Sequence, residues 1–237
     1  MLSWLAIFAL VREPPRGAGG SETLGSALRG VVSLLKLPHT WGIVALGSVC
    51  YASFVTLRGL WLGPMLIERH GFSLVASGNV ALLMSVSSML GPVIFGRFDP
   101  GPATRRNWIV GCTLAGAALV AAMAFAPLPV LDVGGSILFG LLSGYIVFQY
   151  ADVRAAYPAA MTGRALALFT MSMFLGVALM QWFTGVVASA ADAYALPVFT
   201  VVLATIAAML AAGALAFRWL PRPPSPVGLG ASRGAGA

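Results

Sequence analysis

Arg58 is the first residue whose chemistry needs an explanation, because it interrupts the apolar stretch FVTLRGLWLGPML at residues 54–66. It lies about eight residues from the end of that stretch, or about 12 Å deep at 1.5 Å per helical residue. An arginine in the hydrocarbon core costs about 2.5 to 3.5 kcal/mol on insertion scales and stays protonated. Arg58 must therefore find water, a ligand or a partner; snorkelling or bonding to backbone carbonyls near Pro64 would also satisfy it.

Catalytic chemistry has little support elsewhere in the apolar segments. None of them carries a carboxylate at mid-depth, or a Ser/His, His/Glu or paired-Asp arrangement, so no catalytic residue is assigned and an enzyme is not expected. Cys50 and Cys112 lie in apolar runs without metal-ligand spacing and read as small buried hydrophobes. No metal and no cofactor are expected.

The composition sets the class of protein that must position Arg58. The chain of 237 residues is 59% hydrophobic and only 9% charged, whereas a soluble domain carries about 25% charged residues. This indicates an integral membrane protein. The 14 basic residues exceed the 7 acidic ones, but no basic stripe with interleaved aromatics exists, so nucleic acid is not an expected partner and the lipid bilayer is.

Six long apolar segments are expected to cross the membrane as helices, since each approaches or exceeds the length of about 20 residues that a span needs. The first begins at Thr40, ends at Leu66 and contains Arg58. The other five are free of charge: Leu74 to Phe95, Trp108 to Ala126, Val133 to Ala151, Ala165 to Ala188 and Leu196 to Phe217.

The distribution of basic residues predicts the orientation. Only Arg69 lies on one side of the six segments, and the positive-inside rule makes the other, basic side cytoplasmic. Both termini are then cytoplasmic, and a multi-pass protein of the cell (inner) membrane is expected. Twelve basic residues lie on the cytoplasmic side: Arg12, Arg16, Arg29, Lys36, Arg97, Arg105, Arg106, Arg154, Arg164, Arg218, Arg222 and Arg233.

The flanking segments complete the expected organisation. Residues 1–12 read as the remnant of a preceding transmembrane helix, and residues 13–38 as a cytoplasmic linker that contains an amphipathic helix, capped by Ser21, along the interface. Residues 39–218 form the six-helix bundle. Residues 219–237, rich in Pro, Gly and Ala, are expected to be a disordered cytoplasmic tail.

Several stretches resemble the C-terminal half of a major facilitator superfamily transporter. RGLWLGPMLIERHGFS is similar to the end of that half's first helix and its external loop, and TGRALALFTMSMFLGVALMQWFTG, with Gly163 and Arg164, to its penultimate helix. GNVALLMSVSSMLGPVIFGRFD, followed by two arginines, resembles the second helix and the family's cytoplasmic loop signature. The opening residues resemble the sixth helix and the linker between halves. The likeness covers residues 1 to about 220 and implies an all-α, polytopic, six-helix half.

The resemblance also implies roles for individual residues. The family's loop joins neighbouring helix ends through charge pairs and helix dipoles; Asp99, Arg105 and Arg106 are retained here, but the middle of the loop is Pro-Gly-Pro. In the family, the first and fourth helices of a half line the central cavity. Arg58 facing that cavity could bind an anion, and Tyr145, with Gln149 nearer the cytoplasmic end, could hydrogen-bond a solute. Asn79 and Gln181 could line the path or join helices.

Transport of an unidentified small solute, possibly anionic, by alternating access is the function that the resemblance implies. The family uses two six-helix halves, so the second wall of the path must come from another half, from a homo-oligomer, or from residues missing by truncation. The alternative is a non-transporting or truncated protein with an assembly or regulatory role. A membrane subunit of an ATP-driven importer is disfavoured, because no sizeable loop with a coupling helix is present.

Overall fold

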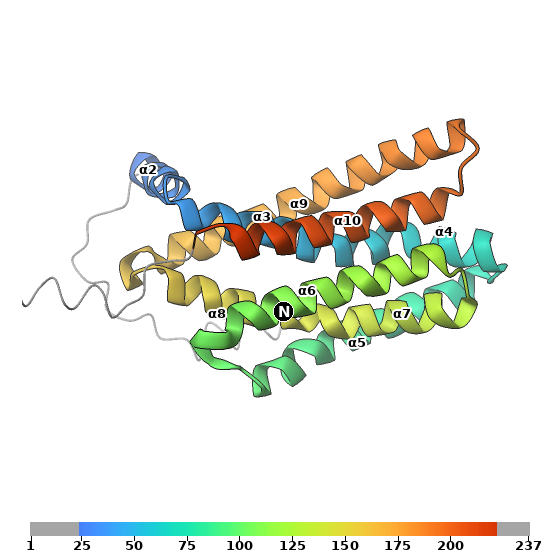
Figure 1. Cartoon of the computed structure of the whole chain (residues 1–237), viewed down its shortest axis with the longest axis horizontal. Coiled ribbons are helices and arrows are strands. Elements are labelled where there is room, and N and C mark those ends of the chain that lie inside the picture. The colour runs from blue at the N-terminus through green and yellow to red at the C-terminus, as the bar shows by residue number, and fades with distance from the viewer. Residues whose placement is uncertain (1–23, 222–237) are drawn as a thin grey trace, which may run out of the picture.

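The computed structural model describes residues 24–221, and Figure 1 shows them as long helices that run along one axis. Six helices are long and apolar enough to cross a membrane, which confirms the six expected spans. The expected remnant at residues 1–12, the Ser21 cap and most of the expected tail lie outside the described residues.

The chain crosses the bundle six times, and four of the spans are single α-helices. The first crossing is built from α3, η1, α4 and η2, and the fourth from α7, η3 and α8. The bounds are α2 Leu24–Leu35, α3 Pro38–Thr56, η1 Leu57–Trp61, α4 Leu62–Pro64, η2 Met65–Arg69, α5 Leu74–Arg97, α6 Gly101–Phe125, α7 Pro129–Leu142, η3 Ser143–Tyr145, α8 Ile146–Ala156, α9 Ala159–Ala193 and α10 Val198–Trp219.

The bundle has two ends, which can be followed in Figure 1. One carries α2 and the turns at residues 98–100 and 157–158, and is called the α2 end. The other carries the turns at residues 70–73, 126–128 and 194–197, and is called the opposite end. Helix α2 forms within the segment that was expected to be an amphipathic helix. Its position on a membrane surface stays a prediction.

The residues Arg105 and Arg106 of the expected cytoplasmic loop lie in a helix instead, because α6 begins at Gly101 and Pro102 fits its first turn. Helix α9 begins at Ala159, so Gly163 and Arg164 lie within a helix, as the resemblance of their stretch to the penultimate helix implied. Gly101 adopts a φ of 76°, a left-handed conformation that glycine tolerates without strain.

Glycines allow two close helix crossings. A Cβ atom on Gly176 of α9 would overlap the backbone carbonyl of Ser48 in α3, and one on Gly144 would overlap the backbone of Gly91 in α5. The first crossing joins spans one and five, and the second joins spans two and four.

Two pairs of glycines four residues apart, Gly59 and Gly63 in span one and Gly140 and Gly144 in span four, have different surroundings. Gly140 and Gly144 pack against α5, where a Cβ on Gly140 would lie 2.5 Å from the Met84 carbonyl oxygen. Gly59 and Gly63 have no atom within 4 Å of an added Cβ. Gly140 and Gly144 therefore serve helix packing, whereas Gly59 and Gly63 face open space.

Candidate functional site

A cavity of about 300 Å³ lies between spans one, two, three and four. Its lining combines hydroxyls, thiols and an amide with apolar and aromatic groups, and contains no charged residue. The lining residues are Cys50, Tyr51, Phe54, Ser88, Pro92, Cys112, Thr113, Gly116, Phe139, Leu142, Ser143, Gly144, Tyr145, Ile146, Gln149 and Leu210.

A break in span four shapes this cavity. The 3₁₀ turn η3 separates α7 from α8, and all three of its residues line the cavity. The turn coincides with the point where Gly144 meets the backbone of Gly91. Helices interrupted near mid-membrane are a recurrent way in which transporters build a binding site.

Tyr145 is buried, and its hydroxyl is engaged within the bundle. The hydroxyl lies 2.8 Å from Thr113 Oγ1 and 3.0 Å from Cys50 Sγ. Thr113 Oγ1 also donates to the Ile109 carbonyl at 2.8 Å. These bonds join spans one, three and four along the cavity wall.

Gln149 lies one helical turn from Tyr145 and has a different environment. Only 3% of its surface is exposed, although its position near the end of the span is also typical of an interfacial residue. Neither amide atom has a hydrogen-bond partner of ordinary geometry, although the Cys50 thiol lies beside it. A buried polar group left unpaired costs about 1–3 kcal/mol, so a cavity ligand that bonds to this amide would be favoured.

Arg58 is exposed and lies in the π-helical turn η1. Its Nε donates to Ser85 Oγ of α5 at 2.6 Å. It therefore pairs with a side chain rather than with backbone near Pro64. Tyr51, Phe54 and Arg58 have the spacing of one helix face, and Ser85 precedes the cavity residue Ser88 by one turn. Arg58 thus lies on the surface that contains the cavity, nearer to the opposite end.

The other two expected lining residues lie elsewhere. Asn79 is exposed on α5, and Gln181 is half-buried on α9; neither lines the cavity. Gln181 lies two turns from Phe174, whose ring meets that of Tyr51 at a centroid distance of 5.8 Å. The structure thus brings Arg58, Tyr145 and Gln149 to one surface, while Asn79 and Gln181 remain outside it.

The retained loop residues at the α2 end form an ion pair. Arg105 donates from Nε and Nη2 to the two carboxylate oxygens of Asp99, at 3.1 and 2.7 Å. These hydrogen bonds hold the pKa of Asp99 below its usual range, aided by a bond from the Gly101 N–H. The pair fixes the turn between α5 and α6.

Arg106 and Arg164 connect helices at the same end. Arg106 bonds to the carbonyls of Phe217 and, at 2.9 Å, Leu220, and stacks over the Phe217 ring. A cation at the C-terminal carbonyls of α10 is favoured by the helix dipole. The side chain of Arg164 lies against Gly30 of α2, whereas Gly163 of α9 faces open space.

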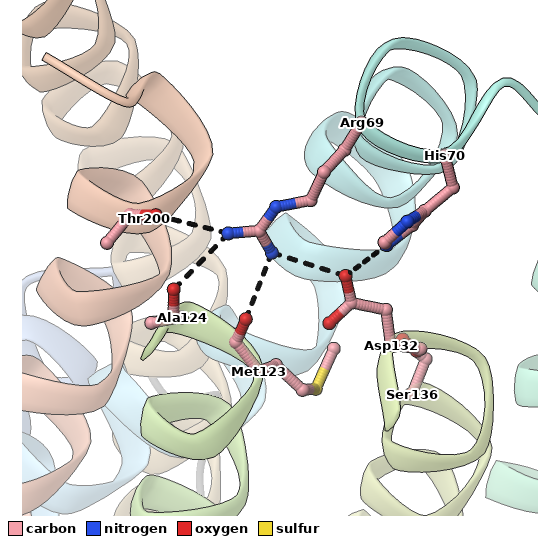
Figure 2. Close-up of polar contacts among 7 residues, drawn as sticks. All are labelled: Arg69, His70, Met123, Ala124, Asp132, Ser136 and Thr200. Atoms are coloured by element: carbon pink, nitrogen blue, oxygen red, sulfur yellow. Dashed lines mark hydrogen bonds and ion pairs between the residues drawn. The ribbon is translucent and has the colours of Figure 1, made fainter. Parts of the chain in front are cut away.

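A second polar group, which the sequence analysis did not assign, lies at the opposite end (Figure 2). Asp132 of α7 is fully buried, and its Oδ2 accepts from Arg69 at 3.2 Å and lies 2.6 Å from His70 Nε2. Arg69 also donates to the carbonyls of Met123 and Ala124 and to Thr200 Oγ1, at 3.0 to 3.2 Å. One guanidinium thereby joins the ends of spans one, three, four and six.

The sequence contains one signal for this cluster. Arg69 is the only basic residue expected on its side of the membrane apart from the histidine beside it, and Asp132 is an acid at the start of a span on that side. Their proximity is not visible in the sequence, because 62 residues separate His70 from Asp132. Among residues 24–221, no group of three or more His, Cys, Asp or Glu could hold a metal.

The described residues have the fold of an all-α, polytopic membrane protein. Comparison with known proteins shows which solved structure shares this fold. No family model and no curated protein matches the sequence. A crystal structure of a bacterial homologue of the human lysosomal transporter Spinster, inward-facing and unoccupied, matches with a TM-score of 0.51 at 18% identity.

The match covers 92% of this chain and 54% of the other, so the chain spans about half the length of the transporter it resembles. The described residues therefore share the fold of about half of that transporter, and all six of their long helices are apolar enough to cross a membrane. The expected all-α half is confirmed at the level of the fold.

Proposed function

We propose that this bundle forms one wall of a pathway that moves a small solute across a membrane by alternating access, without catalysing a reaction. A second six-helix half, or a second copy of the chain, supplies the other wall. In transporters of this kind, two halves rock about a site near the bilayer midplane. The similarity in fold and the half-length of the match support this proposal.

The observation that carries the proposal is an exposed arginine on a membrane-spanning segment. Ionisable residues within spans almost always face a bundle interior or a water-filled cavity. Arg58 faces outward from this bundle and has a single neutral partner, Ser85. Contact of this surface with lipid would leave the cation in hydrocarbon, so a second wall with water or a ligand between the two is the favoured arrangement.

The cavity beside Arg58 suggests how the solute is held. The Gln149 amide has only the Cys50 thiol beside it and no hydrogen bond of ordinary geometry within the protein, and Arg58 supplies the positive charge on the same surface. We therefore place the hydrogen-bonding part of the solute at Gln149. An anionic group, if the solute has one, would lie toward Arg58. Tyr145, already bonded within the bundle, shapes the wall.

The orientation belongs to this proposal. The α2 end carries the basic side chains Arg29, Lys36, Arg97, Arg154 and Arg218, and the positive-inside rule puts it in the cytoplasm. The protein would then lie in the inner membrane, with its opposite end outside.

A transport assay tests the proposal. The chain, purified in mild detergent together with any membrane partner it retains, is reconstituted into liposomes and screened for uptake of organic phosphates, carboxylates and uncharged polar solutes. We expect at least one solute to be taken up, and Gln149→Leu to lower its uptake about tenfold, as the loss of one hydrogen-bonded contact of 1–3 kcal/mol would.

Two further variants separate the contributions. Asn79→Leu, which removes a polar side chain outside the cavity, should leave uptake unchanged. Arg58→Gln should lower the uptake of anions and spare that of uncharged solutes. Absence of uptake of every solute, or equal uptake by Gln149→Leu and the wild type, would favour the non-transporting alternative.

A further inference from the structure

The Asp132 carboxylate has an unusual set of neighbours for a buried acid. Its ionic partners Arg69 and His70 both use a single oxygen, Oδ2, while Oδ1 is buried and has no hydrogen-bond partner among the described residues. The side chains of Arg69 and His70 are only 12% and 4% exposed. Figure 2 shows Arg69 and His70 approaching Oδ2 from different sides. The cluster therefore combines an engaged oxygen with a vacant acceptor, largely out of contact with bulk water.

The charges of the cluster balance only when the histidine is neutral. Arg69 is always protonated, and an ionised Asp132 offsets it. A proton added to His70, or to the free Oδ1 of Asp132, leaves one net positive charge in a site where charges are weakly screened. Protonation also changes the competition for Oδ2, because a charged His70 at 2.6 Å holds the carboxylate more strongly than Arg69 does at 3.2 Å.

Few other charges act on this pair. From η2, Glu68 is exposed and makes no ion pair among the described residues; Asp192, near the end of α9, is likewise exposed. The α6 end contributes the Met123 and Ala124 carbonyls, and α10 contributes Thr200. The segment leading into α5 contributes the Phe72 ring, 6.4 Å from the His70 ring. The cluster is therefore controlled mainly by Arg69, His70 and Asp132 themselves.

We propose that His70 and Asp132 form a proton-binding site at the opposite end of the bundle, and that proton binding loosens the hold of Arg69 on the ends of spans three, four and six. The step is the transfer of one proton from a hydronium ion, which leaves as water, to His70 or Asp132, and no other covalent bond is made or broken. Because the two groups share a hydrogen bond, the proton belongs to the pair rather than to either residue. The site does not depend on the solute pathway proposed above.

The chain is well suited to a direct test, because it contains only two histidines, His39 and His70. Protein labelled with ¹³C and ¹⁵N at histidine and arginine, and purified through a histidine-free affinity tag, gives two histidine ring signals in NMR spectra together with the arginine side-chain signals. His39→Gln identifies the His70 signal. We expect the pH dependence of that signal to differ between the wild type and the charge variants described below, and the Arg69 side-chain signal, identified with Arg69→Gln, to change with the same midpoint as the His70 signal.

Charge variants give opposite expected shifts. Asp132→Asn removes the neighbouring anion and should weaken proton binding by the His70 ring at least about tenfold. Arg69→Gln removes the repelling cation and should strengthen proton binding by the His70 ring. If Asp132→Asn fails to fold, the result for Arg69→Gln tests the proton site by itself. A His70 signal that does not titrate, or one whose midpoint is the same in the wild type and in every folded charge variant, would overturn the proton site. An Arg69 signal indifferent to pH would overturn the coupling.

The spectra report proton binding in the absence of any solute. A failed uptake assay would therefore leave the proton site standing, and a failed titration would leave the proposed solute pathway standing.

Discussion

At the scale of single residues, polar groups within the spans are handled in three ways. Tyr145 is bonded within the bundle, Gln149 is buried with its amide unpaired, and Arg58 is exposed with one neutral partner. A folded protein pairs most of its buried polar groups, so the unpaired amide stands out. These differences in environment, rather than residue type, are why we propose Gln149 and Arg58 as the groups that contact a ligand.

Asp99 gives a prediction about pH at this scale. Its pKa is lowered chiefly by hydrogen bonds from Arg105, so the pair stabilises the fold fully above the unfolded pKa of about 4. This contribution is lost as the pH falls through the lower, folded pKa. The difference in thermal unfolding midpoint between the wild type and Asp99→Asn should be constant from pH 7 to about 4 and shrink below that.

The effect will be modest, since the Asp99 side chain is 47% exposed and exposed pairs contribute little. A difference between the two proteins that grows on acidification would contradict the assignment.

At the scale of elements, backbone contact between helices organises the bundle. Spans one and five meet where Gly176 faces the Ser48 carbonyl, and spans two and four meet where Gly144 faces Gly91. The second contact coincides with η3, which positions Tyr145 and opens the cavity. Packing of small residues and the shape of the candidate site are therefore linked in span four.

Replacing Gly176 with alanine should disrupt the crossing between spans one and five. The added methyl group has no room beside Ser48, and overpacking of this kind costs about 1–3 kcal/mol. Gly185→Ala in the same helix is the matched control, because an added Cβ there meets nothing within 4 Å and alanine favours the helix by up to about 1 kcal/mol. Unfolding in mild detergent should show a lower midpoint for Gly176→Ala alone; equal midpoints would contradict the crossing.

At the scale of the molecule, the bundle presents one incomplete wall. The helices α5 and α9 expose large apolar side chains along most of their length, among them Leu82, Leu83, Met89, Phe174 and Trp182. The most apolar part of α5 is only 17% buried, less than that of any other described span. Lipid can cover these faces, whereas Arg58, which has the spacing of the helix face that carries the cavity residues Tyr51 and Phe54, is better satisfied by water or a ligand there than by lipid. This combination agrees with a second wall there.

The proposed orientation can be checked without knowledge of the solute. Reporter proteins fused after Phe98, in the turn at the α2 end, should be active as cytoplasmic fusions. Fusions after Gly71, in the turn at the opposite end, should be active as external fusions. The physical reason is the excess of basic side chains at the α2 end. Reporter activities with the reverse pattern would contradict both the orientation and the placement of the His70–Asp132 pair outside.

The sequence by itself determined the number and positions of the spans. Apolar length is a local property, and a membrane requires each apolar segment to satisfy its own backbone as a helix. Local signals also located α2, whereas the start of α6 at Gly101 was missed because its Pro-Gly-Pro segment was read as part of a loop.

Only the tertiary structure decided which polar residues meet. Spans that are apolar on all sides give no periodic signal for their inward face, so Gln149 could not be told from an interfacial residue, nor Asn79 from a cavity residue. The pairing of Arg58 with Ser85, and of Arg69 and His70 with Asp132, joins residues 27 to 63 positions apart. Such contacts depend on how helices rotate and cross, and close approach of backbones at Gly91, Gly144 and Gly176 sets that geometry.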